Sequence, residues 1–223
     1  MKILIDTADT SAIRKAYEYL PIKGVTTNPS ILLKAKRDPK EVLQEIRGIV
    51  RNDDFHVQAV GSTSEELVED ARAIRKALGK DIYVKIAATP EGFKAMKILK
   101  TDDYRITATA IYYEKQALLA SQIGVDYIAP YFNRISNEGM DPCLVISNMK
   151  KILEGTGTKI LAASFKRSEQ VVAAALLQVE AITVSPEVLD ELSASEKIIE
   201  VAEKFNSDFH ELTGSAKGLK DIL

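Results

Sequence analysis

The sequence predicts an α/β protein, a compact (β/α)8 TIM barrel with an extra C-terminal helix, and three observations support this prediction. Short apolar or β-branched runs alternate eight times with segments of helical spacing along the 223 residues. Such alternation builds a parallel sheet, and eight units favour its closure into a barrel. The alternative is an open doubly wound sheet, but no G-x-G-x-x-G pattern follows the first apolar run. No linker or low-complexity stretch interrupts the pattern, so we expect residues 1–223 to form a single domain.

The predicted strands are short runs in which Val, Ile, Thr and Ala dominate. Strands of a parallel barrel are covered on both faces and therefore read as nearly continuous apolar segments. In chain order the predicted strands are Ile3–Ile5, Gly24–Thr27, His56–Val60, Ile82–Ile86, Ile106–Ile111, Tyr127–Phe132, Ile160–Phe165 and Ala181–Val184.

The predicted helices carry an apolar stripe at intervals of three and four residues, and several begin with proline or serine, as first helical turns often do. The clearest stripe contains Leu67, Val68, Ala71, Ile74 and Leu78. Between the strands these helices are Asp9–Leu20, Pro39–Val50, Ser64–Leu78, Pro90–Leu99, Glu114–Ser121, Pro142–Leu153 and Ser168–Gln178. After the eighth strand we expect a short helix from Pro186, a longer C-terminal helix over about 195–212, and a tail over 213–223.

Charge and composition exclude several classes of function. The 30 Lys and Arg residues nearly balance the 32 Asp and Glu residues, which argues against a nucleic-acid partner. The longest apolar run, Val171–Leu177, is too short to cross a membrane, and the N-terminus lacks the pattern of a signal peptide. The single cysteine, Cys143, cannot form an internal disulfide, and no Cys/His cluster has zinc-ligand spacing. We therefore expect a cytoplasmic enzyme with no metal and no other cofactor.

Polar side chains follow every predicted strand. The active site of a (β/α)8 barrel lies at the carboxyl ends of its strands, so these side chains are expected to share one cavity. The candidate residues are Asp6, Thr26, Thr27, Asn28, Gln58, Lys85, Thr107, Thr109, Tyr131, Asn133, Arg134, Ser164, Lys166 and Ser185.

Lys85 is the most informative of these residues because it interrupts the apolar strand Ile82–Ile86. Burial lowers the pKa of an ammonium group, and the free amine can attack a ketone or aldehyde to form a Schiff base. The structural alternative is a lysine at a strand end that pairs with a carboxylate or reaches solvent. Asp6 could pair with Lys85 or bind a substrate hydroxyl, although a cap or turn role is also open to it. Asn28 precedes a proline and could simply shape a turn.

The remaining candidates divide by chemistry. Gln58, Thr109 and Tyr131 could hold a water that carries protons, or they could be satisfied polar groups of the barrel core. Thr26 and Thr107 are expected to line the substrate. Arg134, Ser164 and Lys166 offer charge and hydrogen bonds for a phosphate, and the helix beginning near Ser168 could add its N-terminal dipole. A pair of solvated cations is the alternative. His56 and His210 are interpreted as structural.

Several of these segments resemble the transaldolase and fructose-6-phosphate aldolase family, and the resemblance runs from Met1 to the final helix. Its strongest pieces are Leu4-Ile-Asp-Thr-Ala8, Gly24-Val-Thr-Thr-Asn-Pro-Ser30, Val84-Lys-Ile86, Ala129-Pro-Tyr-Phe-Asn-Arg-Ile135, Ala162-Ala-Ser-Phe-Lys166 and Ile182-Thr-Val-Ser-Pro186. The resemblance implies a compact barrel and a metal-free class I aldol mechanism in which Lys85 forms the Schiff base. It further implies that Asp6 and Asn28 contact a dihydroxyacetone moiety, and that Arg134, Ser164 and Lys166 hold the phosphate.

Four positions bear on the branch of the family. Transaldolases typically carry Glu at Gln58, Asn at Thr107, Ser at Ala129 and Phe at Tyr131. Three of these positions resemble the fructose-6-phosphate aldolase branch, whereas Thr107 matches neither branch.

The expected activity is reversible cleavage of fructose 6-phosphate into dihydroxyacetone and glyceraldehyde 3-phosphate. The alternatives are a transaldolase, which transfers the same three-carbon unit between sugar phosphates, and a non-catalytic barrel that binds a sugar phosphate. The expected partner is thus a small phosphosugar. The resemblance also implies a homo-oligomer, a pentamer or decamer, with the C-terminal helix packed on a neighbour.

Overall fold

Eight parallel strands pair in sequence order, and β8 pairs back onto β1 to close a barrel, as the sequence predicts. The computed structural model describes residues 1–193, 195–214 and 217–223. The strands are β1 (Lys2–Asp6), β2 (Gly24–Thr26), β3 (Asp54–Gln58), β4 (Tyr83–Ala87), β5 (Arg105–Ile111), β6 (Tyr127–Pro130), β7 (Lys159–Ala162) and β8 (Ala181–Val184).

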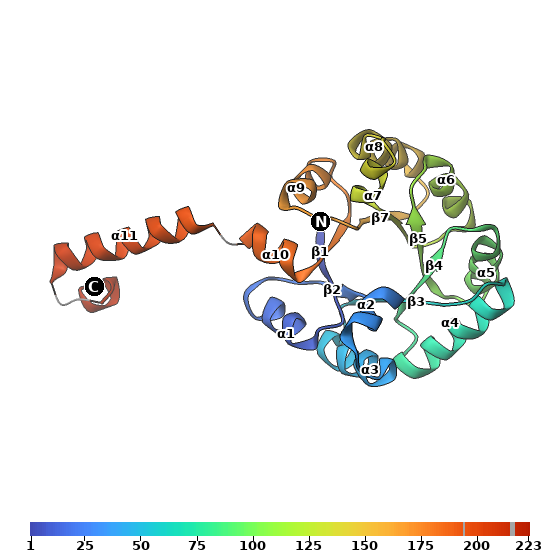
Figure 1. The fold of residues 1–223 in the computed structure, drawn as a ribbon, viewed down its shortest axis with the longest axis horizontal. Helices are drawn as coiled ribbons and strands as arrows, with labels where there is room; N and C mark the ends of the chain where they lie inside the picture. Colours follow the sequence, from blue (N-terminus) through green and yellow to red (C-terminus); the bar gives the residue numbers. More distant parts are fainter. Residues whose placement is uncertain (194, 215–216) are drawn as a thin grey trace.

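Helices surround this barrel as an outer ring (Figure 1). The described helices are α1 (Thr10–Tyr19), α2 (Pro29–Ala35), α3 (Pro39–Val50), α4 (Ser64–Leu78), α5 (Pro90–Thr101), α6 (Glu114–Ile123), α7 (Phe132–Asn137), α8 (Pro142–Leu153), α9 (Ser168–Leu176), α10 (Pro186–Ser193), α11 (Glu196–Thr213) and the short 3-10 turn η1 (Leu219–Asp221). The extra C-terminal helix is α11, and Figure 1 shows that it lies away from the barrel. Of the helices in the described residues, none is long and apolar enough to cross a membrane.

Two short helices, α2 and α7, were not predicted. Asn28 caps α2 by accepting a hydrogen bond from the Ile31 backbone N–H, and Pro29 occupies its first turn. The sequence left Asn28 open between a turn and a substrate contact and indicated no helix after it, because seven residues are too few to display helical periodicity. The predicted strand Tyr127–Phe132 ends early, at Pro130, and Phe132 instead begins α7.

Two further strand boundaries also differ from the prediction. The predicted strand His56–Val60 lies at Asp54–Gln58, and Val60 is 62% exposed after the strand has ended. The predicted strand Ile160–Phe165 ends at Ala162, and Phe165 packs against Phe132 with ring centroids 5.6 Å apart. Phe165 lies in the loop after β7 and is apolar because it packs into the main core, not because it belongs to the sheet.

Side chains alternate along each strand between the outer and the inner face of the barrel, and each face carries an apolar cluster. On the inner face the apolar side chains give way to polar ones towards the carboxyl ends of the strands. Side chains such as Val84 and Ile86 pack outward against the helices in the main core. The inward side chains Leu4, Tyr127 and Leu161 form a separate cluster inside the barrel. The inward residues nearer the carboxyl ends of the strands, Lys85 among them, are polar. This change from apolar to polar along the barrel axis leaves a cavity at the catalytic end of the fold.

Candidate active site

A cavity of about 1310 Å³ opens at the carboxyl ends of the strands, and every strand contributes at least one residue to its wall. The predicted site residues that line it are Asp6, Thr26, Asn28, Gln58, Lys85, Thr109, Tyr131, Arg134, Ser164, Lys166 and Ser185, whereas Thr27, Thr107 and Asn133 are not part of its wall. Barrel closure thus gathers residues that are spread over 180 positions of the sequence, from 6 to 185, around one space.

Lys85 lies at the centre of β4, and its side chain enters the cavity from the barrel wall. The residue is only 6% exposed. Its Nζ donates a hydrogen bond to the Thr27 backbone carbonyl at 2.8 Å. Burial lowers the pKa of Lys85, and the nearby Asp6 carboxylate opposes that effect without cancelling it. The result is an amine that is held in one position and deprotonates more readily than an exposed lysine.

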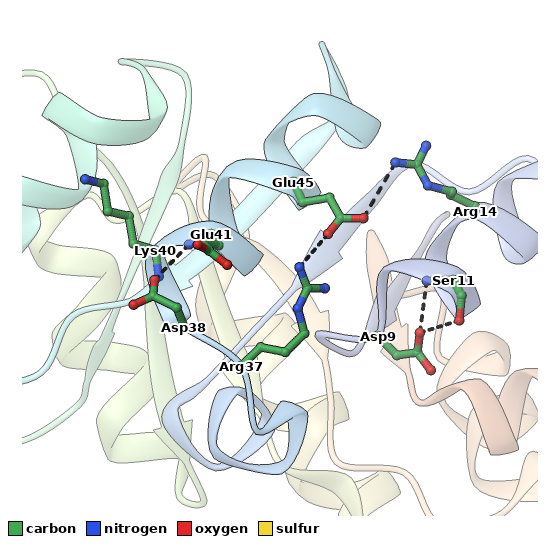
Figure 2. Close-up of polar contacts among 8 residues, drawn as sticks. All are labelled: Asp9, Ser11, Arg14, Arg37, Asp38, Lys40, Glu41 and Glu45. Atoms are coloured by element: carbon green, nitrogen blue, oxygen red, sulfur yellow. Dashed lines mark hydrogen bonds and ion pairs between the residues drawn. The ribbon is translucent and has the colours of Figure 1, made fainter.

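Asp6 belongs to a hydrogen-bonded row on β1, β2 and β8. The Thr26 hydroxyl donates to Asp6 Oδ1 at 2.5 Å, and Thr26 and Thr183 hydroxyl oxygens are 2.7 Å apart. A hydroxyl has one proton to donate, so Thr183 is the donor in the second bond. The cap of α1 is Asp9, which accepts from the Ser11 backbone N–H (Figure 2). Asp6 is therefore free of the cap role and presents its carboxylate to the cavity.

Asn28 combines the two roles that the sequence left open. Its Oδ1 accepts from the Ile31 backbone N–H at 3.0 Å, while the residue also lines the cavity. An Asn side chain has two amide protons beyond that acceptor oxygen. Asn28 can therefore cap α2 and donate to a ligand at the same time.

The proposed water-holding groups lie at the carboxyl end of β3, on β5 and directly after β6. Thr109 and Tyr131 hydroxyl oxygens are 2.9 Å apart. Gln58 is the register partner of Lys85 on the adjacent strand β3. A register shift in β5 between Ala108 and Ile111 accompanies a left-handed φ of 56° at Ala110, directly after Thr109. Such non-glycine strain is concentrated at functional sites, and here it lies in the wall of the cavity.

The candidate phosphate-binding residues follow β6 and β7. They lie on the side of the barrel opposite β2, which carries Thr26. Ser164 has a left-handed φ of 64°. The Lys166 backbone N–H donates to Gln170 Oε1 at 2.7 Å, and Gln170 Nε2 donates to Asn133 Oδ1 at 2.9 Å, so the loop is tied to α7. The expected contribution of the α9 N-terminus is reduced, because the Ser168 N–H and hydroxyl both donate to the Glu191 carboxylate.

Arg134 approaches the cavity from α7 and is held by two tyrosines. Its guanidinium carbon lies 4.7 Å from the centre of the Tyr131 ring. Its NH1 group donates to the Tyr112 hydroxyl at 3.2 Å. This hydrogen bond is the main reason that the pKa of Arg134 is raised above its usual value.

Contrary to the expectation that it lines the substrate, Thr107 is not part of the cavity wall. It is fully buried one layer below the site, where its hydroxyl lies 2.9 Å from His56 Nδ1. His56 stacks on Tyr83 with ring centroids 4.5 Å apart. The pKa of His56 lies well below its usual value. Burial is the main cause, and the positive charges of Lys85 and Lys2 lower it further. Both residues therefore belong to the barrel interior, and His210 lies on α11.

The sequence analysis missed several charged residues at the rim of the cavity. Lys34 and Arg37 line it from the α2 side, and Glu187 lines it from α10. Hydrogen bonding from Ser185, and more weakly the charges of Lys34 and Lys166, lower the pKa of Glu187. No sequence signal marked these residues, since they lie on surface segments whose proximity depends on barrel closure.

Arg37 lines the cavity, but the residue that holds its guanidinium lies outside the cavity. Glu45 accepts from Arg37 NH2 at 3.0 Å and lies 3.7 Å from Arg14 NH2 (Figure 2). The Asp38 carboxylate caps α3 by accepting from the Lys40 and Glu41 backbone N–H groups, also drawn in Figure 2. These contacts fix the segment that connects α2 to α3 along the rim.

Lysine, carboxylate, amide and hydroxyl groups thus surround a space that carries several cations at its edge. Within the described residues, no group of three or more His, Cys, Asp or Glu side chains is arranged to hold a metal ion. The fold and the cavity define a (β/α)8-barrel protein with a polar, lysine-centred site at the carboxyl ends of its strands.

Residues 3–220 match the family model described as "Transaldolase/Fructose-6-phosphate aldolase". The chain therefore belongs to the transaldolase and fructose-6-phosphate aldolase family, which is a family of enzymes. This membership confirms the resemblance found in the sequence.

Similar curated proteins carry both names of the family. A "Probable fructose-6-phosphate aldolase" of Streptococcus pneumoniae is 36% identical over 222 residues, which cover 96% of this chain and 99% of that protein. A "Probable transaldolase" of Roseobacter denitrificans is 35% identical, over 96% of this chain and 98% of that protein. A "Probable transaldolase" of Clostridium botulinum is 36% identical, over 97% and 100% respectively.

Solved structures of two flavocytochrome b2 variants share the fold. Their TM-scores are 0.58 and 0.59 at 13% identity. The match covers 83% of this chain but only 56% and 57% of those longer chains. This similarity concerns the barrel architecture alone.

Proposed function

We propose that the protein is a class I, Schiff-base aldolase that reversibly cleaves fructose 6-phosphate into dihydroxyacetone and glyceraldehyde 3-phosphate. The observation that carries the proposal is the buried amine of Lys85, with its lowered pKa, inside a polar cavity. Membership of an aldolase and transaldolase family supports a carbon–carbon bond reaction at this amine.

In the first half of the proposed reaction, the Lys85 amine attacks the C2 ketone and water leaves, which gives a protonated imine. A water held by Gln58, Thr109 and Tyr131 accepts the proton of the C4 hydroxyl. The bond between C3 and C4 then breaks, its electrons pass to the imine, and glyceraldehyde 3-phosphate departs as the aldehyde. An iminium group accepts these electrons far more readily than the ketone itself, which is the reason for the covalent step.

In the second half, the enamine left on Lys85 takes a proton at C3 from the Tyr131 side of the cavity. Water then hydrolyses the imine and releases dihydroxyacetone and the free amine. Asp6, Thr26 and Asn28 are assigned to the hydroxyls of the three-carbon fragment, since they line the same cavity as Lys85 from β1, β2 and the start of α2. The Thr26 hydroxyl bound to Asp6 fixes the direction of that carboxylate.

The phosphate is assigned to Arg134, Ser164 and Lys166, which lie after β6 and β7. Arg134 has guanidinium donors beyond the one given to Tyr112, and a planar array of donors suits a phosphate. The Lys166 ammonium adds charge at the same edge of the cavity.

The second candidate activity is transaldolase, and the names of the similar proteins support it as well. A transaldolase keeps the enamine until an aldose acceptor arrives, so it must avoid protonating C3. Tyr131 favours the aldolase because its hydroxyl lies within hydrogen-bonding distance of Thr109 at the wall of the cavity. A phenol in that position is a donor for C3.

Release of free dihydroxyacetone separates the two activities. With fructose 6-phosphate and no acceptor, we expect dihydroxyacetone and glyceraldehyde 3-phosphate to accumulate in equal amounts over many turnovers. Adding an aldose phosphate such as erythrose 4-phosphate tests for transfer in the same preparation. Glyceraldehyde 3-phosphate produced only when the acceptor is present would identify a transaldolase, and no turnover in either assay would leave a binding protein.

We also propose that the chain forms a homo-oligomer in which α11 packs on a second copy. The helix has no buried residue, and its apolar side chains are strongly exposed, Phe205 at 66% and Leu212 at 82%. Isolated soluble chains rarely expose an apolar surface of this kind, so a partner surface is expected to cover it. The pentamer or decamer expected from the family resemblance is the specific form proposed.

Light scattering tests the assembly. We expect the unmodified protein to have several times the mass of one chain, and Phe205→Lys to shift the distribution towards smaller species. Ser207→Lys adds the same charge on the opposite side of the helix and is expected to preserve the assembly. A monomeric unmodified protein, or an equal effect of both substitutions, would contradict the proposal.

A further inference from the structure

Among the candidate phosphate ligands, Arg134 is the one that contacts two tyrosine side chains. Only one of these two tyrosines lines the cavity. Tyr131 and Arg134 line the cavity, whereas Tyr112 is not part of its wall. Tyr112 lies behind them: its hydroxyl accepts from Arg134 NH1 at 3.2 Å, and its ring meets that of Tyr131 at 67° with centroids 5.8 Å apart. Tyr112 therefore reaches the site only through these two residues.

The backbone of Tyr112 is fixed by its surroundings. It directly follows β5, whose register shift brings Ile111 opposite Pro130, next to Tyr131. Gln116 Oε1 accepts from the Tyr112 backbone N–H at 2.8 Å, and Gln116 Nε2 donates to the Ala110 carbonyl at 3.0 Å. One glutamine thus ties the residue to the strained end of the strand. With its backbone fixed and its ring packed against the Tyr131 ring, Tyr112 presents its hydroxyl as a fixed acceptor.

A fixed acceptor matters because the arginine side chain is long and Arg134 is largely exposed. An exposed arginine samples many rotamers, and binding a ligand must restrict them. The Tyr112 hydroxyl and the Tyr131 ring face restrict Arg134 before any ligand arrives, which improves affinity without a new contact. Only one of the five guanidinium donors is used in the bond to Tyr112, so the others can bind phosphate oxygens.

We propose that Tyr112 is a positioning residue that gives the enzyme its preference for phosphorylated over unphosphorylated aldehydes, by holding Arg134 at the phosphate end of the cavity. The inference rests on the proposed function for the identity of the substrate. Its physical basis is the row of contacts from Gln116 through Tyr112 to Arg134. Tyr112 supplies no proton to the reaction, because it lies outside the cavity.

The substitution Tyr112→Phe removes the acceptor oxygen and keeps the ring that packs on Tyr131. For synthesis from dihydroxyacetone, we expect KM for glyceraldehyde 3-phosphate to rise by about 3- to 10-fold, the size of one ordinary hydrogen bond, with kcat nearly constant. For unphosphorylated glyceraldehyde the change in kcat/KM is expected to be smaller, so the ratio of the two specificities falls. The neighbouring Tyr113, 40% exposed, gives the matched control Tyr113→Phe.

A double-mutant cycle with Arg134→Ala tests the route of the effect. If Tyr112 acts through Arg134, adding Tyr112→Phe to Arg134→Ala changes the specificity ratio no further. A full additional loss in that background would overturn the inference. So would equal losses for both aldehydes, which would point to a general structural role.

Binding of inorganic phosphate, followed by calorimetry, separates this inference from the proposed function. Phosphate needs only the anion site and no turnover. We expect Tyr112→Phe to weaken phosphate binding by the same factor as it raises KM, and Tyr113→Phe to leave that binding unaltered. Unaltered phosphate binding in Tyr112→Phe would refute the positioning role, whereas absence of aldol turnover with normal phosphate binding would refute only the proposed function.

Discussion

Replacing Lys85 by methionine is expected to lower the rate of aldol cleavage by at least about 10³-fold, the scale seen when a covalent enzyme loses its nucleophile. Methionine has a similar length and fills the same space in β4, so the barrel is expected to close normally. The lost group is the buried amine in the wall of the cavity. The measurement is the initial rate of dihydroxyacetone release from fructose 6-phosphate.

Borohydride trapping tests the covalent step directly. Reduction in the presence of fructose 6-phosphate is expected to leave a three-carbon adduct on the peptide that contains Lys85. The adduct should be absent from Lys85→Met and present in Lys97→Met, which removes an exposed lysine from α5. An adduct that survives Lys85→Met, or the lack of any adduct in the unmodified protein, would rule out the Schiff-base mechanism and favour a barrel that only binds sugar phosphates.

The substitution Lys85→Met is also expected to change the stability of the fold. Burial lowers the pKa of Lys85 in the folded state, so the folded protein binds fewer protons than the unfolded chain between that lowered pKa and the ordinary lysine value of about 10.4. Stability therefore rises with pH across this window. At pH values below this window Lys85 is charged in the folded protein, so the full free-energy cost of burying that charge is present.

Methionine carries no such charge, so we expect Lys85→Met to be more stable than the unmodified protein at pH 7. Its advantage is expected to shrink as the pH approaches 10. Urea unfolding at several pH values measures the difference. An advantage that stays constant with pH would show that the lost hydrogen bond to the Thr27 carbonyl, and not the charge, decides the effect.

Replacing Tyr131 by phenylalanine is expected to lower the release of free dihydroxyacetone by about 10²-fold, in the usual range for loss of a general acid. The ring under Arg134 remains, so phosphate binding should change little. The bond between the Thr109 and Tyr131 hydroxyls is lost, and with it the donor for C3 of the enamine. Transfer of the three-carbon unit to an aldose acceptor is expected to fall less, because that path needs no protonation at C3.

Parallel assays with and without erythrose 4-phosphate measure both rates in one preparation. Tyr113→Phe, which also removes one tyrosine hydroxyl, is the control and is expected to behave as the unmodified protein. Equal reductions of release and transfer by Tyr131→Phe would contradict a specific role at C3. They would instead show that the phenol acts mainly through the water that serves carbon–carbon cleavage, the step that both activities share.

Much of the site was visible in the sequence because it depends on local pattern. Lys85 stands out since it interrupts an apolar strand, and a buried cation needs a reason that a surface lysine does not. Asp6, Gln58 and Thr109 were found in the same way, as polar residues where strands end. Because parallel strands of a barrel present those ends on one face, their assembly around one cavity follows from fold class.

Other features could not be read from the sequence. Helices α2 and α7 are seven and six residues long, too short for periodicity to reveal them. The depth of a residue is also hidden, because Thr107 and Thr109 both point inward and differ only in their level along the barrel axis. Thr107 meets His56 in the interior, whereas Thr109 meets Tyr131 at the cavity.

The sequence by itself determined the eight strand–helix units, the (β/α)8 barrel and the lysine at its centre. Each of these follows from the alternation of apolar and polar residues within a few positions of one another. Only the tertiary structure decided that Tyr112 holds Arg134, that Thr26 joins Asp6 to Thr183, and that Lys34 and Glu187 share a rim. Those contacts join residues that lie far apart along the chain, and their distances are set by strand register and barrel closure, which no local pattern encodes.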